Sequence, residues 1–412
     1  MNRRHFISAL AASAAAPAAR SAAPSITRIT LAPIEGRFHK FVAMNAYDKV
    51  PKGHTYTNVM LRIATNQGVE GVGVMAYSNP DAEYLAALRT LIGANPIDVY
   101  QLSTGRITGR APAYAAVLKK YRHLDGPFLD LIGKLTGKPA WQLLGDSLKD
   151  RVKAYDGTLY FSDIWFKDRG VRAVVEEAEE ARKKGYGGIK LKGGRGRKWM
   201  EQAAGKQRDI DVVNAVRKAV GPEMLIMLDP NNGYQDDLEG AWKLLEETAA
   251  SNLYFLEEPF PENVAHYTEL RARMRKAGMK TLLADGENMA SVAELEPYLK
   301  PARLVDFLQL DIRSCGVLDN QAAARLGQSA GAICMPHNWG SQMGLFLTLH
   351  LAKVTKNMTM VEDDRSSYDV IVADGYSFSD GMYTVPDKPG LSIRVDETVY
   401  QLKCKATETV IS

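Results

Sequence analysis

The sequence predicts an α/β protein: a closed parallel (β/α) barrel preceded by a smaller α+β domain. In the second half of the chain, several apolar runs end in a carboxylate residue that is followed by turn residues. Asp229 and Glu257 are 28 residues apart, and Glu257 and Glu287 are 30 residues apart. Intervals of this length fit one strand-helix-strand unit each. The 412 residues also leave room for a barrel of roughly 250 residues and a second domain.

Composition and charge narrow the range of partners. The chain is 46% hydrophobic and 24% charged, which is ordinary for a soluble globular protein. Its formal net charge is +4, but Arg3, Arg4 and Arg20 contribute three of these charges before any acidic residue occurs. The remainder is nearly neutral and does not point to nucleic acid or a membrane surface. The 3 cysteines are too few for a disulfide framework, and Cys334, in an apolar run, is expected to be buried.

Residues 1–25 are expected to be an export signal of the twin-arginine type. The pair Arg3-Arg4 precedes an alanine-rich apolar run to Ala19, and small residues follow at positions 21–23. This run is too short to span a membrane, so we expect no membrane insertion of the mature chain. The expected location is the periplasm or the outside of the cell. A disordered alanine-rich tail is the alternative interpretation.

Residues 26–150 are expected to form the α+β domain. Two strand-like runs between residues 59 and 74 flank turn residues, which predicts a β-hairpin. Helical stretches follow at 81–91 and 125–135, and strands followed by helices are typical of an α+β domain. Segment 34–53 has few periodic features. It is open to two interpretations, a mobile flap over a site or an ordinary connecting loop.

Alternating strands and helices define the barrel domain, residues 151–370. Apolar residues at helical spacing begin at Val171 and stop at Gly185, and a second helix is predicted over 210–220. Eight strands are expected, each with a polar residue at its exit. From the second strand onward these exits carry Lys192, Asp229, Glu257, Glu287, Asp311, His337 and Glu362. Residues 371–412 contain no further repeat and are expected to pack on the N-terminal domain.

The three carboxylates are expected to meet at the carboxyl face of the barrel, where parallel strands end. Each pair repels by about 4 kcal/mol at ~4 Å and an effective dielectric constant of 20, so the cluster needs a cation or protons. Oxygen ligands, few in number, favour Mg²⁺. The alternative is that Asp229, Glu257 and Glu287 pair with Lys190 and Lys192.

Basic groups are expected on two sides of this cluster. Lys190 and Lys192 share one face of a strand, and each is expected to lower the pKa of the other, which suits a general base. A solvated lysine pair on an edge strand is the alternative. Asp311, one strand before His337, would fix its tautomer and raise its basicity. Glu362 would hydrogen-bond to a substrate oxygen or cap a turn. These groups fit removal of a proton from carbon next to a carboxylate, with the metal as Lewis acid.

The residues in this order resemble the enolase superfamily, and within it the mandelate racemase/muconate lactonizing enzyme-like branch. Six motifs at the right spacing carry the resemblance, together with the link Gly133-Lys134-Leu135-Thr136-Gly137-Lys138-Pro139 before the barrel. They are Lys190-Leu191-Lys192, Asp229-Pro230-Asn231, Glu257-Glu258-Pro259, Gly286-Glu287-Asn288, Asp311 and His337. The resemblance covers nearly the whole chain after residue 25.

The resemblance implies a modified TIM (β/α) barrel with an N-terminal capping domain, frequent homo-oligomers and one Mg²⁺ per subunit. The implied ligands of the ion are Asp229, Glu257 and Glu287. The implied acid/base groups are Lys192 on one side and His337 with Asp311 on the other. Lys190 would orient the substrate carboxylate, and Glu362 would interact with an enediolate intermediate. Asn231 and Asn288 are expected to contact the substrate.

The leading functional hypothesis is dehydration of an acid sugar or related hydroxy acid, a small-molecule carboxylate. Racemisation or epimerisation of a 2-hydroxy acid is the alternative, because the same residues serve both reactions. A barrel glycosidase would leave the lysine pair unexplained. A non-catalytic exported binding protein for sugar acids is a hypothesis from another class. Specificity is expected to come from 34–53 and 77–81, and the basic residues at 195–198 to be a solvated loop rather than an anion site.

Overall fold

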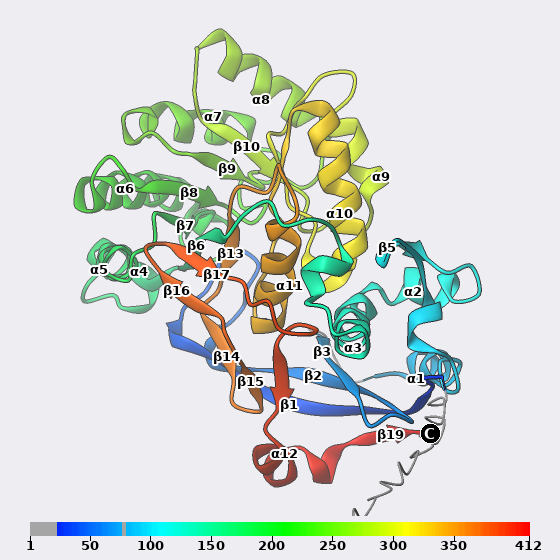
Figure 1. Cartoon of the computed structure of the whole chain (residues 1–412). Coiled ribbons are helices and arrows are strands. Elements are labelled where there is room, and N and C mark those ends of the chain that lie inside the picture. The colour runs from blue at the N-terminus through cyan, green and yellow to red at the C-terminus, as the bar shows by residue number, and fades with distance from the viewer. Residues whose placement is uncertain (1–22, 76–79) are drawn as a thin grey trace, which may run out of the picture.

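The structure is a computed structural model, and it describes residues 23–75 and 80–412. The predicted export signal lies outside the described residues except for its end, and so does most of the 77–81 loop. Figure 1 shows a long antiparallel sheet, in blue, next to a set of alternating strands and helices in green and yellow. This is the predicted fold class, a barrel with an α+β domain beside it.

The N-terminal domain is built on a five-stranded antiparallel sheet in the order β14-β1-β2-β3, with β19 also paired to β1. Its strands are β1 (Ile26–Val42), β2 (Gly53–Thr65), β3 (Glu70–Met75), β14 (Ser366–Tyr368) and β19 (Thr409–Ile411). The predicted hairpin is confirmed as β2–β3. Two strands of the sheet therefore come from the other end of the chain.

Strand β1 corrects the prediction for segment 34–53. The strand runs to Val42, so only residues 43–52 form a loop. Ile34 and Phe38 are buried while the residues beside them are exposed, which is the alternation of a half-buried strand. Pro33 and Gly36 hide this alternation in the sequence. The glycine is required, because a Cβ there would lie 2.1 Å from the ring of Tyr56.

Helices and a small hairpin complete the N-terminal domain. They are α1 (Ala82–Arg89), β4 (Tyr100–Ser103), β5 (Arg106–Arg110), α2 (Ala115–Lys120) and α3 (Asp125–Thr136). Both predicted helices are confirmed, as α1 and α3. Helix α3 packs on β3 so closely that a Cβ on Gly71 would lie 2.2 Å from the carbonyl oxygen of Pro127.

Eight parallel strands form the barrel. They are β6 (Arg151–Leu159), β7 (Gly188–Lys192), β8 (Leu225–Asp229), β9 (Phe255–Glu257), β10 (Leu282–Asp285), β11 (Phe307–Leu308), β12 (Ile333–Cys334) and β13 (Val361–Asp363). Neighbours in the chain pair from β6 to β12, and β13 closes back on β6. Within the described residues no strand ladder joins β12 to β13. All eight expected strands are present in the expected order.

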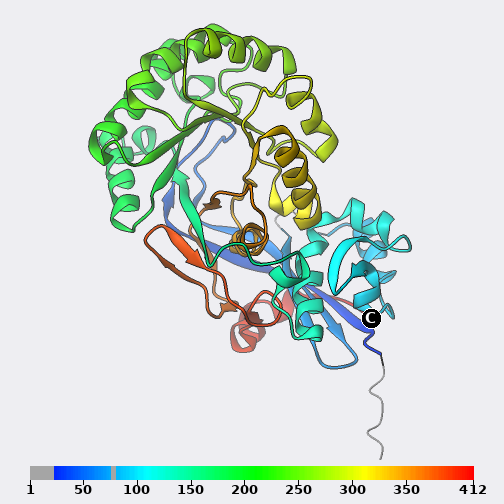
Figure 2. The ribbon, with the colours of Figure 1, turned by 45° about the horizontal axis from the view of Figure 1, so that its top comes forward.

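Helices surround the strands, as the turned view in Figure 2 shows. They are α4 (Ser162–Trp165), α5 (Val171–Lys183), α6 (Gln202–Val220), α7 (Leu238–Glu247), α8 (Val264–Lys276), α9 (Val292–Leu295), α10 (Ile312–Ala330) and α11 (Gln342–Lys353). Helix α6 starts eight residues before the predicted position because Glu201 caps it, accepting a hydrogen bond from the backbone N–H of Ala204.

Large side chains fill the barrel below its carboxyl end. This layer consists of Tyr155, Met227, Phe255, Ala284, Phe307, Met335 and Met360. Because it seals the interior from beneath, polar groups at the strand exits stand on an apolar floor. All three cysteines are buried and free, as expected for Cys334 and for a chain without a disulfide framework.

The C-terminal segment contacts both parts of the molecule. It contains β15 (Ile371–Ala373), β16 (Ser377–Ser379), β17 (Met382–Thr384), β18 (Ile393–Val395) and α12 (Glu397–Lys403). Strand β17 pairs with β6 of the barrel, whereas β19 pairs with β1. The segment contacts the N-terminal domain, as expected, and its pairing with the barrel is an additional contact. Residues 382–384 pair with residues 151–153 at the start of β6, before its parallel pairing with β13 begins at Ala154.

Candidate active site

Three carboxylates meet at the carboxyl end of the barrel. Strand β8 ends at Asp229 and β9 at Glu257, while Glu287 stands two residues beyond β10. One oxygen from each of these side chains lies within 4.8 Å of one from each of the others. Asp229 and Glu257 are fully buried, and the Glu287 side chain is 10% exposed. The structure therefore brings together the three residues that the sequence singled out.

Both lysines of β7 reach this cluster from the same side of the strand. The Lys190 Nζ lies 2.9 Å from Glu257 Oε1 and 2.8 Å from Glu362 Oε1, and it is completely buried. Lys192 hydrogen-bonds to Asp229. The two lysines thus occupy one barrel face, which excludes a solvated pair on an edge strand.

Lys190 lowers the pKa of Lys192, as expected, but the net pKa of both lysines is raised. Burial lowers the pKa of Lys190, but the carboxylates of Glu257 and Glu362 outweigh burial and hold the pKa well above its usual range. Burial likewise lowers the pKa of Lys192, and Asp229 more than restores it. The attraction of the surrounding carboxylates exceeds the repulsion between the two ammonium groups.

His337 and Asp311 form a pair on the other side of the cluster. His337 Nδ1 lies 2.8 Å from Asp311 Oδ2, and its Nε2 lies 3.2 Å from Glu287 Oε2. Asp311 also caps α10, accepting hydrogen bonds from the backbone N–H groups of Arg313 and Ser314. Burial alone would lower the pKa of His337, yet Glu287 and Asp311 raise it. Asp311 therefore fixes both the position and the protonation preference of the imidazole.

Arg313 is a partner of this pair that the sequence did not reveal. Its guanidinium donates to Asp311 and to the carbonyl oxygen of Trp339. Burial raises the pKa of Asp311, but Arg313 and His337 outweigh it and hold the pKa well below its usual range. The carboxylate therefore stays ionised next to the imidazole.

Glu362 stands at the exit of the eighth strand, between the lysine and histidine sides. Its Oε1 pairs with Lys190 and its Oε2 accepts a hydrogen bond of 3.2 Å from the backbone N–H of Asn338. A Cβ on Gly157, in the first strand, would lie 2.6 Å from Glu362 Oε1. Only glycine at that position leaves room for the carboxylate, so β6 is shaped around it.

Asn231, Asn288 and Gln309 support the carboxylates. The backbone N–H of Asn231 donates to Asp229 Oδ1 at 2.8 Å. The Asn288 amide donates at 2.8 Å to Glu258, next to the ligand candidate Glu257. Gln309 donates at 2.9 Å to Glu257 Oε2. It was not predicted, because a single glutamine at a strand end carries no spacing pattern.

Tyr47 connects the loop of the N-terminal domain to the exits of the barrel strands. Its hydroxyl donates to Glu258 Oε2 at 3.1 Å and accepts hydrogen bonds from the amides of Asn232 and Asn288 at 2.6 and 2.9 Å. Loop 43–52 is therefore fixed over the barrel by three contacts at one side chain. Tyr47 was visible in the sequence as an aromatic residue, but nothing there indicated which residues its hydroxyl group contacts.

Arg195 corrects the expectation of a solvated basic loop. The side chain is fully buried and forms ion pairs of 2.8 Å with Asp163 and Asp209. Its Nη1 also donates at 2.9 Å to the carbonyl oxygen of Lys192. Arg195 therefore anchors the end of the strand that carries both lysines. Three basic residues within four positions look solvated in a sequence unless acidic partners, which lie 14 and 32 residues from Arg195, are known.

The residues present fit a divalent cation. Three buried carboxylates within 4.8 Å repel each other, and their oxygens are the donors that Mg²⁺ prefers. Asn231 Oδ1 is buried in the described structure without a hydrogen-bond partner, while Glu287 Oε2 forms an ion pair with His337 but no hydrogen bond there. Unpaired acceptors beside a carboxylate cluster are the arrangement expected where an ion with its water or substrate ligands belongs.

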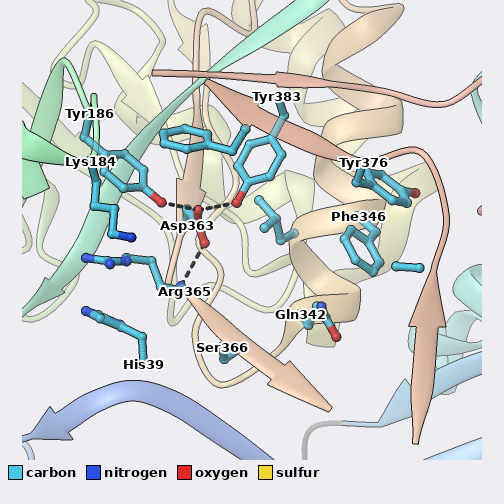
Figure 3. A pocket seen from close by; sticks show the side chains of 13 residues that line it. His39, Lys184, Tyr186, Gln342, Phe346, Asp363, Arg365, Ser366, Tyr376 and Tyr383 are labelled. Carbon is cyan, nitrogen blue, oxygen red and sulfur yellow. Dashed lines mark hydrogen bonds between the residues drawn. The ribbon is translucent and has the colours of Figure 1, made fainter. Parts of the chain in front are cut away.

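A separate cavity of about 430 Å³ lies outside the barrel, behind the eighth strand. Figure 3 shows Asp363 at its centre, with the hydroxyl groups of Tyr186 and Tyr383 donating to one carboxylate oxygen at 2.6 and 2.7 Å. His39 lines this cavity rather than the barrel mouth. None of the site residues predicted from the sequence lies here, so the two regions are chemically distinct.

Comparisons with known proteins agree with this arrangement. The family model for the "Enolase C-terminal domain-like" family matches residues 173–399. Arabinonate dehydratase of Saccharolobus solfataricus is 27% identical over 289 residues, covering 69% of this chain and 72% of that protein. In the described structure no helix is long and apolar enough to cross a membrane.

Solved structures extend the likeness to the whole fold. Galacturonate dehydratase from a Geobacillus species, in complex with D-galacturonate and 5-keto-4-deoxy-D-galacturonate, is 28% identical with a TM-score of 0.82. That match covers 95% of this chain and 99% of that one. A mandelate racemase/muconate lactonizing protein from Geobacillus sp. Y412MC10, complexed with magnesium and tartrate, is 30% identical with a TM-score of 0.79 over 92% of this chain and 95% of that one.

Proposed function

We infer the reaction from the family: this chain belongs to the enolase superfamily, in its mandelate racemase-like branch. We propose that it is a Mg²⁺-dependent dehydratase of an acid sugar or related hydroxy acid. One observation supports this most directly. Lys192 contacts Asp229 and His337 contacts Glu287, so two basic groups reach the carboxylate cluster from opposite sides.

The proposed ligands of the ion are Asp229, Glu257 and Glu287, with one Mg²⁺ per subunit. When bound, the ion offsets the charge of these carboxylates and, as a Lewis acid, stabilises negative charge that develops on the substrate carboxylate. Lys190, fixed between Glu257 and Glu362, holds a positive charge where the substrate carboxylate binds. The fixed ammonium orients the substrate before the reaction begins.

Asp229 holds Lys192 in its charged form, and this attraction weakens where Asp229 serves as a metal ligand instead. The neutral amine of Lys192 then removes the proton from the carbon next to the carboxylate, which converts the substrate into an enediolate. The carbon–oxygen bond at the following carbon then breaks. His337 donates the proton with which the hydroxyl group leaves as water, and Asp311 stabilises the charged imidazole before that step. The enol product tautomerises to a 2-keto-3-deoxy acid, so atoms and charges balance.

Racemisation or epimerisation is the second candidate, because the same two groups stand on opposite sides. If the substrate lacks a leaving group at the next carbon, His337 returns a proton to the opposite face of the carbon from which Lys192 removed one. The mandelate racemase/muconate lactonizing protein is similar over nearly the whole chain, which supports keeping this candidate.

Proton NMR in D₂O separates the candidates. The Mg²⁺-loaded protein is incubated with a panel of aldonates, aldarates and 2-hydroxy acids. A dehydratase gives a 2-keto-3-deoxy product, whereas an epimerase exchanges the proton at C2 for deuterium without loss of water. Confirmed metal and substrate binding with neither change would favour a non-catalytic binding protein and reject both proposed reactions.

We also propose export and self-association, which rest on the sequence and the resemblance. Residues 1–25 are proposed to direct twin-arginine export to the periplasm. A folded reporter fused to these residues should leave the cytoplasm, and replacing Arg3 and Arg4 by lysine should retain it. The mature chain is proposed to form a homo-oligomer, which light scattering measures directly; a monomer would reject that proposal.

A further inference from the structure

An aromatic wall stands on the side of the site opposite the carboxylates. It consists of Phe38, Trp339 and Tyr160. The ring of Tyr160 lies 4.6 Å from that of Trp339, which lies 5.1 Å from that of Phe38. Tyr160 follows the first barrel strand and Trp339 the seventh, whereas the carboxylates follow the third to fifth. Substrate between the two sides therefore meets the wall on one side and the carboxylates on the other.

Tyr160 is the member of the wall nearest the proposed base. Lys192 Nζ lies 5.4 Å from the centroid of its ring. Asp48 of loop 43–52 and Asp229 of the carboxylate cluster are the charges that most raise the pKa of its hydroxyl group. Tyr160 therefore stands beside the side chain that is proposed to take the proton from the substrate.

The hydroxyl group of Tyr160 has no hydrogen-bond partner within residues 23–75 and 80–412. The side chain is only 2% exposed, and its ring is held by Trp339. Burial raises the pKa of the phenol well above its usual range, so the group is a neutral O–H donor. A nearly buried hydroxyl without a partner costs free energy unless a water or a ligand satisfies it.

Unpaired acceptors on the opposite side point to the chemical class of the ligand. Asn231 Oδ1, Asn232 Oδ1 and Gln309 Oε1 are buried without a hydrogen-bond partner in the described residues. They follow the third and sixth strands, near the carboxylates. Hydroxyl groups are donors of the kind that such acceptors need, so the pattern fits a ligand with more than one hydroxyl group better than an apolar acid.

We propose that Tyr160 is a specificity-determining residue, which selects those hydroxy acids that carry a second hydroxyl group. The Tyr160 hydroxyl hydrogen-bonds to the substrate hydroxyl on the carbon next to the one that loses its proton. The flat ring of Trp339 holds Tyr160 in this position. This inference rests on the proposed function, which places the reacting carbon beside Lys192.

Binding of two acids that differ by one hydroxyl group tests the proposal without any turnover. Calorimetry on the Mg²⁺-loaded full chain compares the tighter-binding enantiomer of tartrate with malate of matching configuration. Both keep a hydroxyl next to one carboxylate, and only tartrate has the second. The wild type should bind tartrate more tightly. Tyr160→Phe should weaken tartrate binding about tenfold and leave malate binding unchanged.

Tyr254→Phe is the matched control. Tyr254 stands just before β9, at the other end of the barrel, and its hydroxyl has no hydrogen-bond partner in the described part of the chain. Its replacement should change neither affinity. Equal weakening of both acids by Tyr160→Phe, or no weakening of tartrate, overturns the assignment of Tyr160. Failure of the wild type to prefer tartrate overturns the selection of a second hydroxyl group.

The two proposals fail separately. If the wild type prefers tartrate and Tyr160→Phe removes that preference, Tyr160 keeps its assignment even where NMR shows no exchange at C2. If NMR shows dehydration but the variant keeps the tartrate preference, the reaction stands and the role of Tyr160 falls. Equal thermal unfolding midpoints of the three proteins show that the comparison concerns binding and not folding.

Discussion

Lys190 and Lys192 lie two positions apart on one strand, yet their surroundings suit different tasks. Lys190 is locked between two glutamates and is completely buried. Lys192 pairs with one carboxylate, Asp229, and stands beneath the ring of Tyr160 near the mouth of the barrel. A side chain with fewer anchors is freer to give and take a proton, so Lys192 is the better candidate for the base.

Lys192→Met is expected to lower turnover of the active acid by about 10²–10⁴-fold, because it removes the proposed general base. Metal binding should persist, since all three carboxylates remain. An assay of product formation measures turnover, and calorimetry with Mg²⁺ measures metal binding.

Lys184→Met is the control for this prediction. Lys184 is exposed and lines the separate cavity behind the eighth strand. It should leave turnover unchanged. Retained turnover in Lys192→Met would contradict the catalytic assignment, while loss in both variants would point to a general effect on the fold.

At the scale of strands and helices, much was predictable because apolar runs and turn residues set each barrel strand. Asp229, Glu257 and Glu287 were found because strand exits recur at regular intervals. Strand β1 was missed past Ile34, since Pro33 and Gly36 interrupt its alternation. A periodic pattern is local, so it locates an element and its exits.

Contacts across the barrel were not predictable in this way. Tyr160 and Trp339 each follow a strand exit closely, and an aromatic residue there is the one feature that points to them. Their contact depends on closure of the barrel, which brings the first and seventh strands to either side of the eighth, and no local pattern encodes this. The burial of Arg195 likewise depends on Asp163 and Asp209, which belong to other elements.

Strand β13 carries one carboxylate to each of its faces, Glu362 into the barrel and Asp363 outward. Asp363 is fully buried, and burial raises its pKa to about 6 despite the two tyrosine donors. The folded protein therefore binds this proton more tightly than the unfolded chain, whose aspartate pKa is about 3.9. Its contribution to stability is complete below that value and is lost as the pH rises through about 6.

Asp363→Asn is expected to remove this pH dependence, because the amide imitates the protonated acid. Between pH 4 and pH 7 the variant should gain about 2 kcal/mol relative to the wild type, since about two pKa units separate the folded from the unfolded state and each unit corresponds to about 1.4 kcal/mol. Urea unfolding of both proteins at several pH values measures the difference. A constant difference across this range would contradict the raised pKa.

At the scale of the whole molecule, one buried carboxylate joins segments that are far apart in the sequence. Asp130 of α3 accepts hydrogen bonds from the backbone N–H groups of Val72 and Leu391, at 2.9 and 2.8 Å, and from Lys134 at 2.7 Å. Helix α3, strand β3 and the C-terminal segment are thus held at one point. The N-terminal domain and the end of the chain depend on it together.

Asp130→Ala is expected to lower the free energy of unfolding by about 3 kcal/mol, because it leaves two buried N–H groups without acceptors. Thermal or urea unfolding measures the loss. Asp146→Ala, which removes an exposed carboxylate paired with Arg106, should change stability by less than about 1 kcal/mol. Similar losses in the two variants would contradict the joining role of Asp130.

Strand β1 is among the first parts of the chain to leave the ribosome, but two of its partners are among the last. Ile29 pairs with Ile411 of β19, and Gly36 pairs with Tyr368 of β14. During synthesis the backbone groups at both positions of β1 therefore stay unpaired. They can then pair with a strand of another chain. Contacts between such distant positions also form slowly. The domain that covers the active site is consequently completed only after translation reaches residue 411, and a chaperone that shields β1 until then would raise the yield of folded protein.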